Sequence, residues 1–187
     1  MGLFDKIKSK FVSDDGTYTP PEASFATRPD TVYAPVSGVL IPLEEVNDEI
    51  ISAGLIGNGY GILPTGNGVL YAPVNGRIGA TTVTNHSIGI ATHEGIEVLI
   101  HIGIGTVNMK GKGFKRLVEA NDEVHAGQPI MLFDVDAIKL AGHDEVIACV
   151  ISNPDAFAKI RHVGASGTLI GDRPLVKIGD PLLVAKK

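Results

Sequence analysis

Two histidines are the first candidates for chemistry in this 187-residue chain. His101 lies in the stretch Val98 to Thr106, where apolar residues alternate with Leu, His and Gly. Successive side chains of a β-strand point to opposite faces, so the stretch predicts a strand with an apolar core face and a second face that carries the imidazole. His86 lies far enough upstream for a turn and a return strand. The pattern alone leaves two interpretations open, a functional pair of histidines on a sheet surface and a lone surface histidine without a chemical role.

A histidine pair suits phosphoryl transfer. Neutral imidazole has a free lone pair near pH 7 and can attack phosphorus without a separate base. The group in transit is loose and metaphosphate-like, so the protein mainly supplies alignment and hydrogen-bond donors. His86 could donate such a bond to a phosphoryl group on His101, and Thr84 could fix the tautomer of His86. Gly103 and Gly105, placed on the same face as His101, would leave room for another molecule to approach the ring.

Two other chemistries are open to the same residues. His86 and His101 could hold zinc with a free coordination position, but the sequence has no His-x-His pair and no His-Glu-x-x-His motif, so no metal is required. Repeated Ala-Pro-Val-x-Gly strands are reminiscent of biotinyl and lipoyl carrier domains, yet the nearest lysine, Lys110, is followed by the wrong residue for such a carrier. No cofactor is expected.

Composition narrows the function classes. The formal net charge is −5 and there is no basic block, which argues against nucleic-acid binding. The single cysteine, Cys149, lies in an apolar run and is expected in the core, which fits a reducing compartment. No apolar run is long enough to span a membrane and no signal peptide is evident, so a cytoplasmic location is expected.

The chain divides into three parts. Residues 1–12 carry apolar side chains at helical spacing among lysines and predict a basic amphipathic segment. Such a segment could bind an anionic membrane surface peripherally, the alternative being a frayed terminus. Residues 13–30 are rich in proline and poor in apolar residues and predict a flexible linker. A single folded domain is expected over 31–187.

Internal repeats indicate the fold of that domain. Residues 33–40 and 71–78 are similar to each other, as are 124–130 and 176–182. Each copy predicts a short strand, a glycine turn and another strand, and the chain contains 23 glycines and 11 prolines. We therefore predict an all-β, antiparallel, single-domain sandwich or barrel with internal duplication. Short helices are expected over 134–141 and from 152 towards Gly164.

Several motifs together resemble a known family, the glucose-type enzyme IIA domain of the bacterial phosphoenolpyruvate-dependent sugar phosphotransferase system. The resemblance covers nearly the whole chain. The matching stretches are residues 1–8, 34–38, 64–67, 72–76, 84–86, 101–104, 110–114 and 150–153.

The resemblance implies a β-sandwich phosphocarrier with internal duplication. His101 stands at the position phosphorylated on Nε2 by the histidine-containing phosphocarrier protein, and the group then passes to a cysteine of an enzyme IIB domain. His86 stands at the second active-site histidine, and Thr84 at the threonine that supports it.

The residues expected to contact a partner protein are Asp48, Asp155, Ile102, Gly103 and Gly105. Asp48 and Asp155 match acidic residues that flank the family's site. The family's usual His-Phe-Gly-Ile-Asp-Thr is here His-Ile-Gly-Ile-Gly-Thr, and an asparagine, Asn58, replaces a common aspartate. These losses leave an alternative open, a regulatory binding protein of the same fold with weak or no phosphotransfer.

Overall fold

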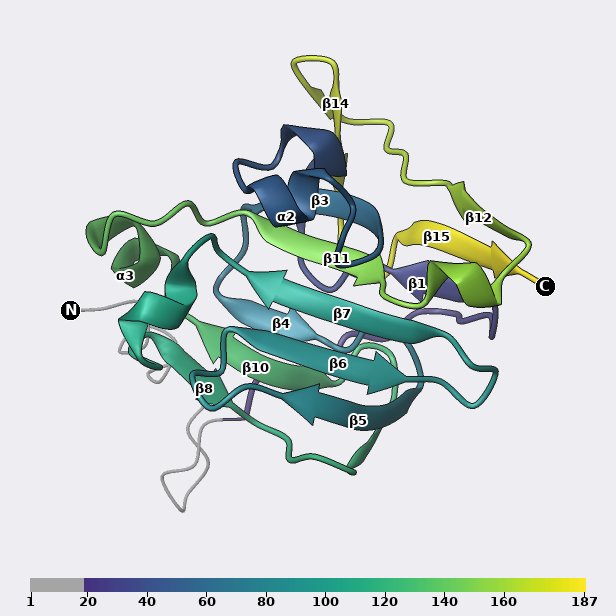
Figure 1. Cartoon of the computed structure of the whole chain (residues 1–187), viewed down its shortest axis with the longest axis horizontal. Helices are drawn as coiled ribbons and strands as arrows, with labels where there is room; N and C mark the ends of the chain where they lie inside the picture. The colour runs from purple at the N-terminus through teal and green to yellow at the C-terminus, as the bar shows by residue number, and fades with distance from the viewer. Residues whose placement is uncertain (1–18) are drawn as a thin grey trace.

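The computed structural model describes residues 19–187. Most of the regular structure is β-strand, and the strands pack in two layers (Figure 1). One layer is a single sheet with these strands: β2 (Gly38–Pro42), β3 (Asn58–Pro64), β5 (Gly76–Thr81), β6 (Ser87–Ala91), β7 (Glu97–Ile102), β9 (Glu123–Val124), β11 (Ile147–Ile151), β13 (Leu169–Ile170) and β14 (Arg173–Val176). Their order is β13-β14-β2-β3-β11-β7-β6-β5-β9, and each neighbouring pair is antiparallel. The edge strands β13 and β9 do not pair with each other within residues 19–187, so the predicted sandwich is confirmed in preference to a closed barrel.

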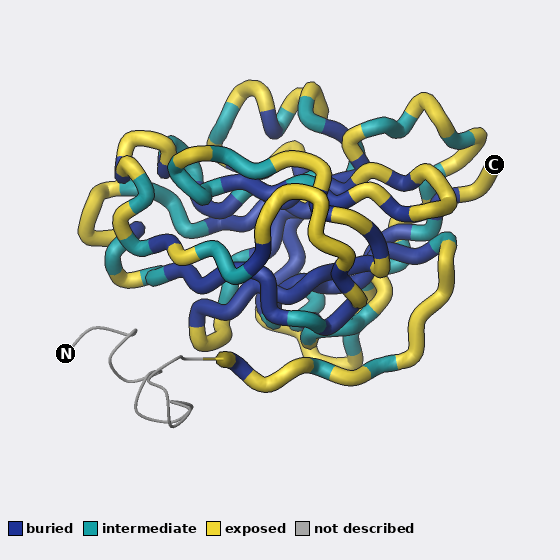
Figure 2. Tube along the Cα trace, turned by 90° about the horizontal axis from the view of Figure 1, so that it is seen from below, coloured by how far each residue is buried: buried dark blue, intermediate teal, exposed yellow. Residues whose placement is uncertain are grey.

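Two three-stranded sheets form the second layer. One contains β1 (Thr31–Tyr33), β15 (Pro181–Lys186) and β12 (Lys159–His162), and the other β4 (Val69–Tyr71), β10 (Pro129–Phe133) and β8 (Phe114–Arg116). One large cluster of buried apolar side chains draws on all three sheets, so the core lies between the layers. Figure 2 shows the buried segments gathered in the interior and the exposed residues mostly in the connecting loops.

Hydrogen bonds display the predicted duplication. Tyr33 N donates to Pro73 O at 3.0 Å, and Tyr71 N donates to Pro35 O at 2.9 Å, so the two copies of the first repeat exchange equivalent bonds. In the second repeat Gly127 N donates to Ala72 O, and its counterpart Gly179 N donates to Ala34 O. Both glycines have positive φ, 90° and 85°, as the turn before each following strand requires.

Helices are few and short. Helix α3 (Val135–Leu140) begins after Asp134, whose carboxylate accepts from Ala137 N, and Gly142 follows it with φ 81°, which confirms the helix expected over 134–141. The helix expected from residue 152 towards Gly164 is wrong. Only a 3₁₀ turn, η3 (Pro154–Ala156), forms there, because the chain then enters β12 and pairs with β15.

A smaller cluster of buried side chains, separate from the main core, covers part of the outer face of the large sheet. The 3₁₀ turn η1 (Leu43–Glu45) and helix α2 (Glu49–Ser52) place Leu43, Val46 and Ile51 against β11. β11 is therefore buried on both faces, and Cys149 on its inner face is fully buried. Burial raises the pKa of the Cys149 thiol to about 12, as expected for a core residue rather than a nucleophile.

The segment before β1 packs on the domain. Ala23 N donates to Gly127 O at 2.9 Å, Tyr71 Oη donates to Pro21 O at 3.2 Å, and the ring of Phe25 lies 5.3 Å from that of Tyr33. The flexible linker predicted over 13–30 therefore does not extend through 19–30.

The amphipathic segment predicted over 1–12 lies outside the described residues. Among those that are described, no helix is long and apolar enough to cross a membrane.

Candidate active site

The site begins on β7, where the predicted alternation is confirmed. Val98, Ile100 and Ile102 are at most 1% exposed and join the main core. His101 points to the other face and lies opposite Ala148 of β11 on one side and Ser87 of β6 on the other. This is the face that η1 and α2 cover further along the sheet.

A turn delivers the second histidine. The chain reverses between β5 and β6 over residues 82–87, where Asn85 N donates to Thr82 O at 3.0 Å. Asn85 has φ 56°, a left-handed conformation that asparagine tolerates better than most residues. His86 ends this turn, and its carbonyl accepts from Ile102 N at 2.8 Å. The turn thereby fixes the backbone of His86 beside the end of β7.

The two rings meet edge to face. The ring centroids of His86 and His101 are 5.1 Å apart, and their planes make an angle of 75°. Thr84 Oγ1 lies 2.5 Å from Nδ1 of His86, and Thr82 Oγ1 lies 3.4 Å from the same nitrogen. The structure therefore brings together the three predicted residues His101, His86 and Thr84, and leaves Nε2 of His86 free of these hydroxyl contacts.

The environment of His101 keeps its ring neutral. Burial lowers the pKa of His101, while the Gly103 backbone and the Asp48 carboxylate oppose the shift. Nδ1 is buried and makes no hydrogen bond of normal geometry within residues 19–187. Burial also lowers the pKa of His86, and the neighbouring His101 adds to this effect. Both shifts favour the neutral form of the ring near pH 7, and Nδ1 is a buried ring nitrogen of His101.

Asp48 is the nearest acidic residue that the sequence singled out. It is the N-cap of α2, and its Oδ1 accepts from Ile50 N and Ile51 N at 2.9 Å each. Its carboxylate charge acts to raise the pKa of His101, against the larger lowering by burial. Asp155 lies in η3, which follows the last residue of β11, whereas Ala148, which pairs with His101, lies near the start of that strand. The Asp155 residue is exposed.

The glycines after His101 do not form the open face that the sequence predicted. β7 ends at Ile102, and Gly103 and Gly105 both adopt left-handed backbone with φ 72° and 69°. Gly103 is buried, and a Cβ there would lie 2.4 Å from a Thr106 methyl carbon. Ile102 is fully buried as well. Neither residue presents a side chain to a partner, and only the half-buried Gly105 remains near the surface.

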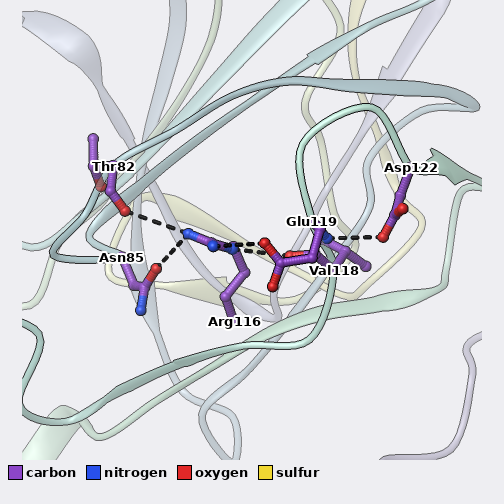
Figure 3. Close-up of polar contacts among 6 residues, drawn as sticks. All are labelled: Thr82, Asn85, Arg116, Val118, Glu119 and Asp122. Carbon is purple, nitrogen blue, oxygen red and sulfur yellow. Dashed lines mark hydrogen bonds and ion pairs between the residues drawn. The ribbon is translucent and has the colours of Figure 1, made fainter.

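Arg116, which the sequence analysis did not single out, supports the turn that carries His86. Figure 3 shows its guanidinium between two groups of acceptors. Nη1 donates to Asn85 Oδ1 at 2.8 Å, Nε to Val118 O at 2.9 Å, and Nη2 to Glu119 Oε2 at 2.8 Å. The signal in the sequence was weak, an arginine two positions after the matching stretch 110–114.

Comparisons with known proteins bear on this geometry. Residues 30–157 match the family model described as phosphoenolpyruvate-dependent sugar phosphotransferase system, EIIA 1. The chain belongs to this family. It is 38% identical over 149 residues to a glucose-specific EIIA component of Halalkalibacterium halodurans, covering 80% of this chain and 86% of that protein.

Two further relatives extend the comparison. A beta-glucoside-specific EIIBCA component of Dickeya chrysanthemi is 39% identical over 153 residues, which are 82% of this chain but only 24% of that longer protein. The solved structure of glucose permease IIA from Mycoplasma capricolum superposes with a TM-score of 0.67 at 31% identity, covering 82% of this chain and 94% of that one. The enzyme IIA chain described here thus shares both sequence and sandwich fold with this family.

The two histidines of the site are also candidate zinc ligands. Within residues 19–187 no three His, Cys, Asp or Glu side chains gather as a metal site, so His86 and His101 form a pair without a third protein ligand. Asn58, which replaces a common aspartate of the family, lies apart from the pair. Its Oδ1 accepts from His162 Nε2 at 2.5 Å.

Proposed function

We propose that this enzyme IIA chain is a phosphohistidine carrier that accepts a phosphoryl group on Nε2 of His101. The observation that carries the proposal is the edge-to-face pair of neutral imidazoles, one with a buried Nδ1 and the other bonded at Nδ1 to a threonine. A neutral ring is nucleophilic, and burial of Nδ1 leaves Nε2 to react.

The donor is the histidine-containing phosphocarrier protein. Its N–P bond breaks as a new N–P bond forms on His101 Nε2, and the donor nitrogen keeps the electron pair. In the second step a cysteine thiolate of enzyme IIB attacks the phosphorus. An S–P bond forms as the N–P bond to His101 Nε2 breaks, and the ring nitrogen keeps the electron pair, so His101 returns to the neutral state. The fusion of A, B and C components in the Dickeya chrysanthemi relative supports an enzyme IIB acceptor.

His86 and Thr84 serve the transfer through one hydrogen-bond chain. If the Thr84 hydroxyl donates to Nδ1, the proton of His86 resides on Nε2, which can then donate to the phosphoryl group on the neighbouring ring. Such a donor stabilises charge on the oxygens as the group leaves.

Asp48 and Asp155 are the acidic residues proposed to meet a basic partner, with Gly105 at the rim. The site of action is cytoplasmic, with peripheral membrane contact through residues 1–12.

Radioactive phosphate from phosphoenolpyruvate, enzyme I and the phosphocarrier protein tests this function. We expect an acid-labile, alkali-stable label on the wild-type chain and none on His101→Gln. His86→Gln should accept the label but deliver it poorly to enzyme IIB. His93→Gln, in the exposed turn at the other end of β6 and β7, is the matched control and should behave as wild type.

Two outcomes would contradict the proposal. Normal labelling of His101→Gln would place the phosphoryl group elsewhere. A folded wild-type chain that takes no label would instead favour the regulatory binding protein, to which the Gly at position 105 in place of the family's acid points.

A further inference from the structure

The guanidinium of Arg116 joins the two layers of the sandwich at the active-site turn. Arg116 belongs to β8 and pairs with Met131 of β10 in a three-stranded sheet. Its Nη1 reaches Asn85 Oδ1 at 2.8 Å and Thr82 O at 3.4 Å, both in the turn between β5 and β6 of the large sheet. A link of this kind restrains the turn from outside its own hairpin.

The arginine is itself held in place. Nε donates to Val118 O and Nη2 to Glu119 Oε2, and Glu119 N in turn donates to Asp122 Oδ2 at 2.8 Å (Figure 3). The Arg116 side chain is only 21% exposed, whereas that of Glu119 is 75% exposed. The planar fork of an arginine loses little further freedom once two of its nitrogens are fixed, so the third is directed at the turn in advance.

Asn85 is the point at which this restraint bears on the chemistry. It lies between Thr84 and His86 in sequence, and its left-handed backbone, φ 56°, sets the direction of the chain on both sides. The hydrogen bond from Arg116 fixes the side chain of Asn85 and so opposes rotation of the turn. Thr84 Oγ1 and His86 Nδ1, which lie 2.5 Å apart, are on the backbone that this bond holds.

We propose that Arg116 is a positioning residue, which through Asn85 fixes the turn that presents Thr84 and His86 to His101. A shift of the turn away from β8 would lengthen and weaken the Arg116–Asn85 bond, which is 2.8 Å long. A displacement of a catalytic group by about 1 Å can cost about a hundredfold in rate, so the restraint has a kinetic consequence. The effect of Arg116 on the transfer rate rests on the proposed phosphotransfer at His101. Its structural part, the fixing of the turn that carries His86, does not depend on that function.

Titration of His86 by NMR reads the structural part without any phosphoryl donor. Burial lowers the pKa of His86, so a loosened turn that exposes the ring should raise it towards its ordinary value of 6.5. We expect this rise in Asn85→Gly, which keeps the left-handed backbone and the Arg116 charge but removes the acceptor. Arg116→Lys, which keeps the charge and loses the fork, should show the same rise.

These variants separate positioning from a simple effect of charge. If Arg116 acted on His86 only through its positive charge, Arg116→Met would raise the pKa of His86 while Arg116→Lys and Asn85→Gly would leave it unchanged, and the proposal would be overturned. Lys115→Met removes a positive charge from the neighbouring, exposed position of the same strand and should not move the titration. Thermal unfolding of each variant confirms that the comparison is made on folded protein.

The kinetic arm compares the two half-reactions. In Asn85→Gly and Arg116→Lys we expect acceptance at His101 close to that of wild type, and delivery to enzyme IIB slower by roughly tenfold to a hundredfold. A general loss of structure would slow both steps together. Unchanged delivery in variants with a shifted His86 titration would overturn the role in transfer. A wild-type chain that takes no label would refute the proposed function instead, and the titration would still decide the positioning of His86.

Discussion

A buried ring nitrogen makes His101 sensitive to acid. Its pKa is lowered from 6.5 chiefly by burial, so the unfolded chain binds more protons than the folded chain between the lowered value and 6.5. Across that window the free energy of unfolding rises with pH, and above 6.5 this penalty is absent. His86 and His162 have pKa values lowered in the same direction, again mainly by burial.

We therefore expect acidification from pH 7.5 to pH 5 to destabilise the wild-type chain more than His101→Gln. The glutamine cannot take up a proton, so it removes one of the groups that gain protons on unfolding. Urea unfolding at the two pH values measures the difference. Equal losses of stability in wild type and His101→Gln would show that burial of the ring does not penalise the imidazolium.

The alternation of β7 made His101 predictable, because Val98, Ile100 and Ile102 had to enter the core and the imidazole then faced outwards. The same reasoning failed at Gly103 and Gly105. A strand pattern assumes extended backbone, whereas both glycines adopt positive φ and turn the chain away from the sheet. Alternation in sequence does not report where a strand ends.

Among the secondary-structure elements, helix α2 has an N-cap, Asp48, that also acts on the pKa of His101. Asp48 accepts two backbone hydrogen bonds at the start of the helix, and its carboxylate opposes the lowering of the His101 pKa. The two effects can be separated because asparagine caps a helix about as well as aspartate but carries no charge. Asp48→Asn should therefore change the electrostatics and leave the helix in place.

We expect Asp48→Asn to lower the pKa of His101 further, with little change in stability. Asp48→Ala should lower the pKa similarly and also cost about 1 kcal/mol of stability, the typical value of an N-cap. NMR titration of His101 and urea unfolding measure the two quantities. A His101 titration that stays in place in both variants would mean that the carboxylate does not act on the site.

Elements differed in how far the sequence could predict them. Helix α3 was predictable because Asp134 and Gly142 mark its ends, but α2 has only four residues and no apolar period to detect. The proline and acid after residue 152 are typical of a helix start, yet pairing of β12 with β15 draws the following residues into a strand. Arg116 was missed because its partner Asn85 is 31 positions away, a contact that only the packing of the two layers creates.

The internal duplication of the whole domain creates two equivalent glycine turns, and residues that precede β1 pack against both of them. A Cβ on Gly127 would lie against Ala23 O, and a Cβ on the equivalent Gly179 would lie 2.4 Å from the ring of Phe25. Each copy of the second repeat thus receives a part of the segment that precedes β1. The domain boundary expected at residue 31 therefore falls inside a packed region, and the dispensable part of the chain should be shorter than 1–30.

Two truncated chains test this boundary and the membrane hypothesis together. Removal of residues 1–18 should leave thermal stability and labelling by the phosphocarrier protein nearly unchanged. It should abolish salt-sensitive binding to anionic vesicles, since the basic amphipathic stretch 1–12 is lost. Removal of residues 1–29 should in addition cost about 2 kcal/mol, the order of burying one phenylalanine side chain.

Phe25→Ala in the full-length chain is the matched variant for the longer truncation. Its ring lies 5.3 Å from that of Tyr33, so its loss should reproduce much of the destabilisation without affecting vesicle binding. Urea unfolding and vesicle co-sedimentation at two salt concentrations measure the two effects. If both truncated chains were as stable as the full-length chain, residues 19–29 would be a linker after all. If vesicle binding survived the removal of 1–18, the membrane contact would lie elsewhere on the enzyme IIA domain.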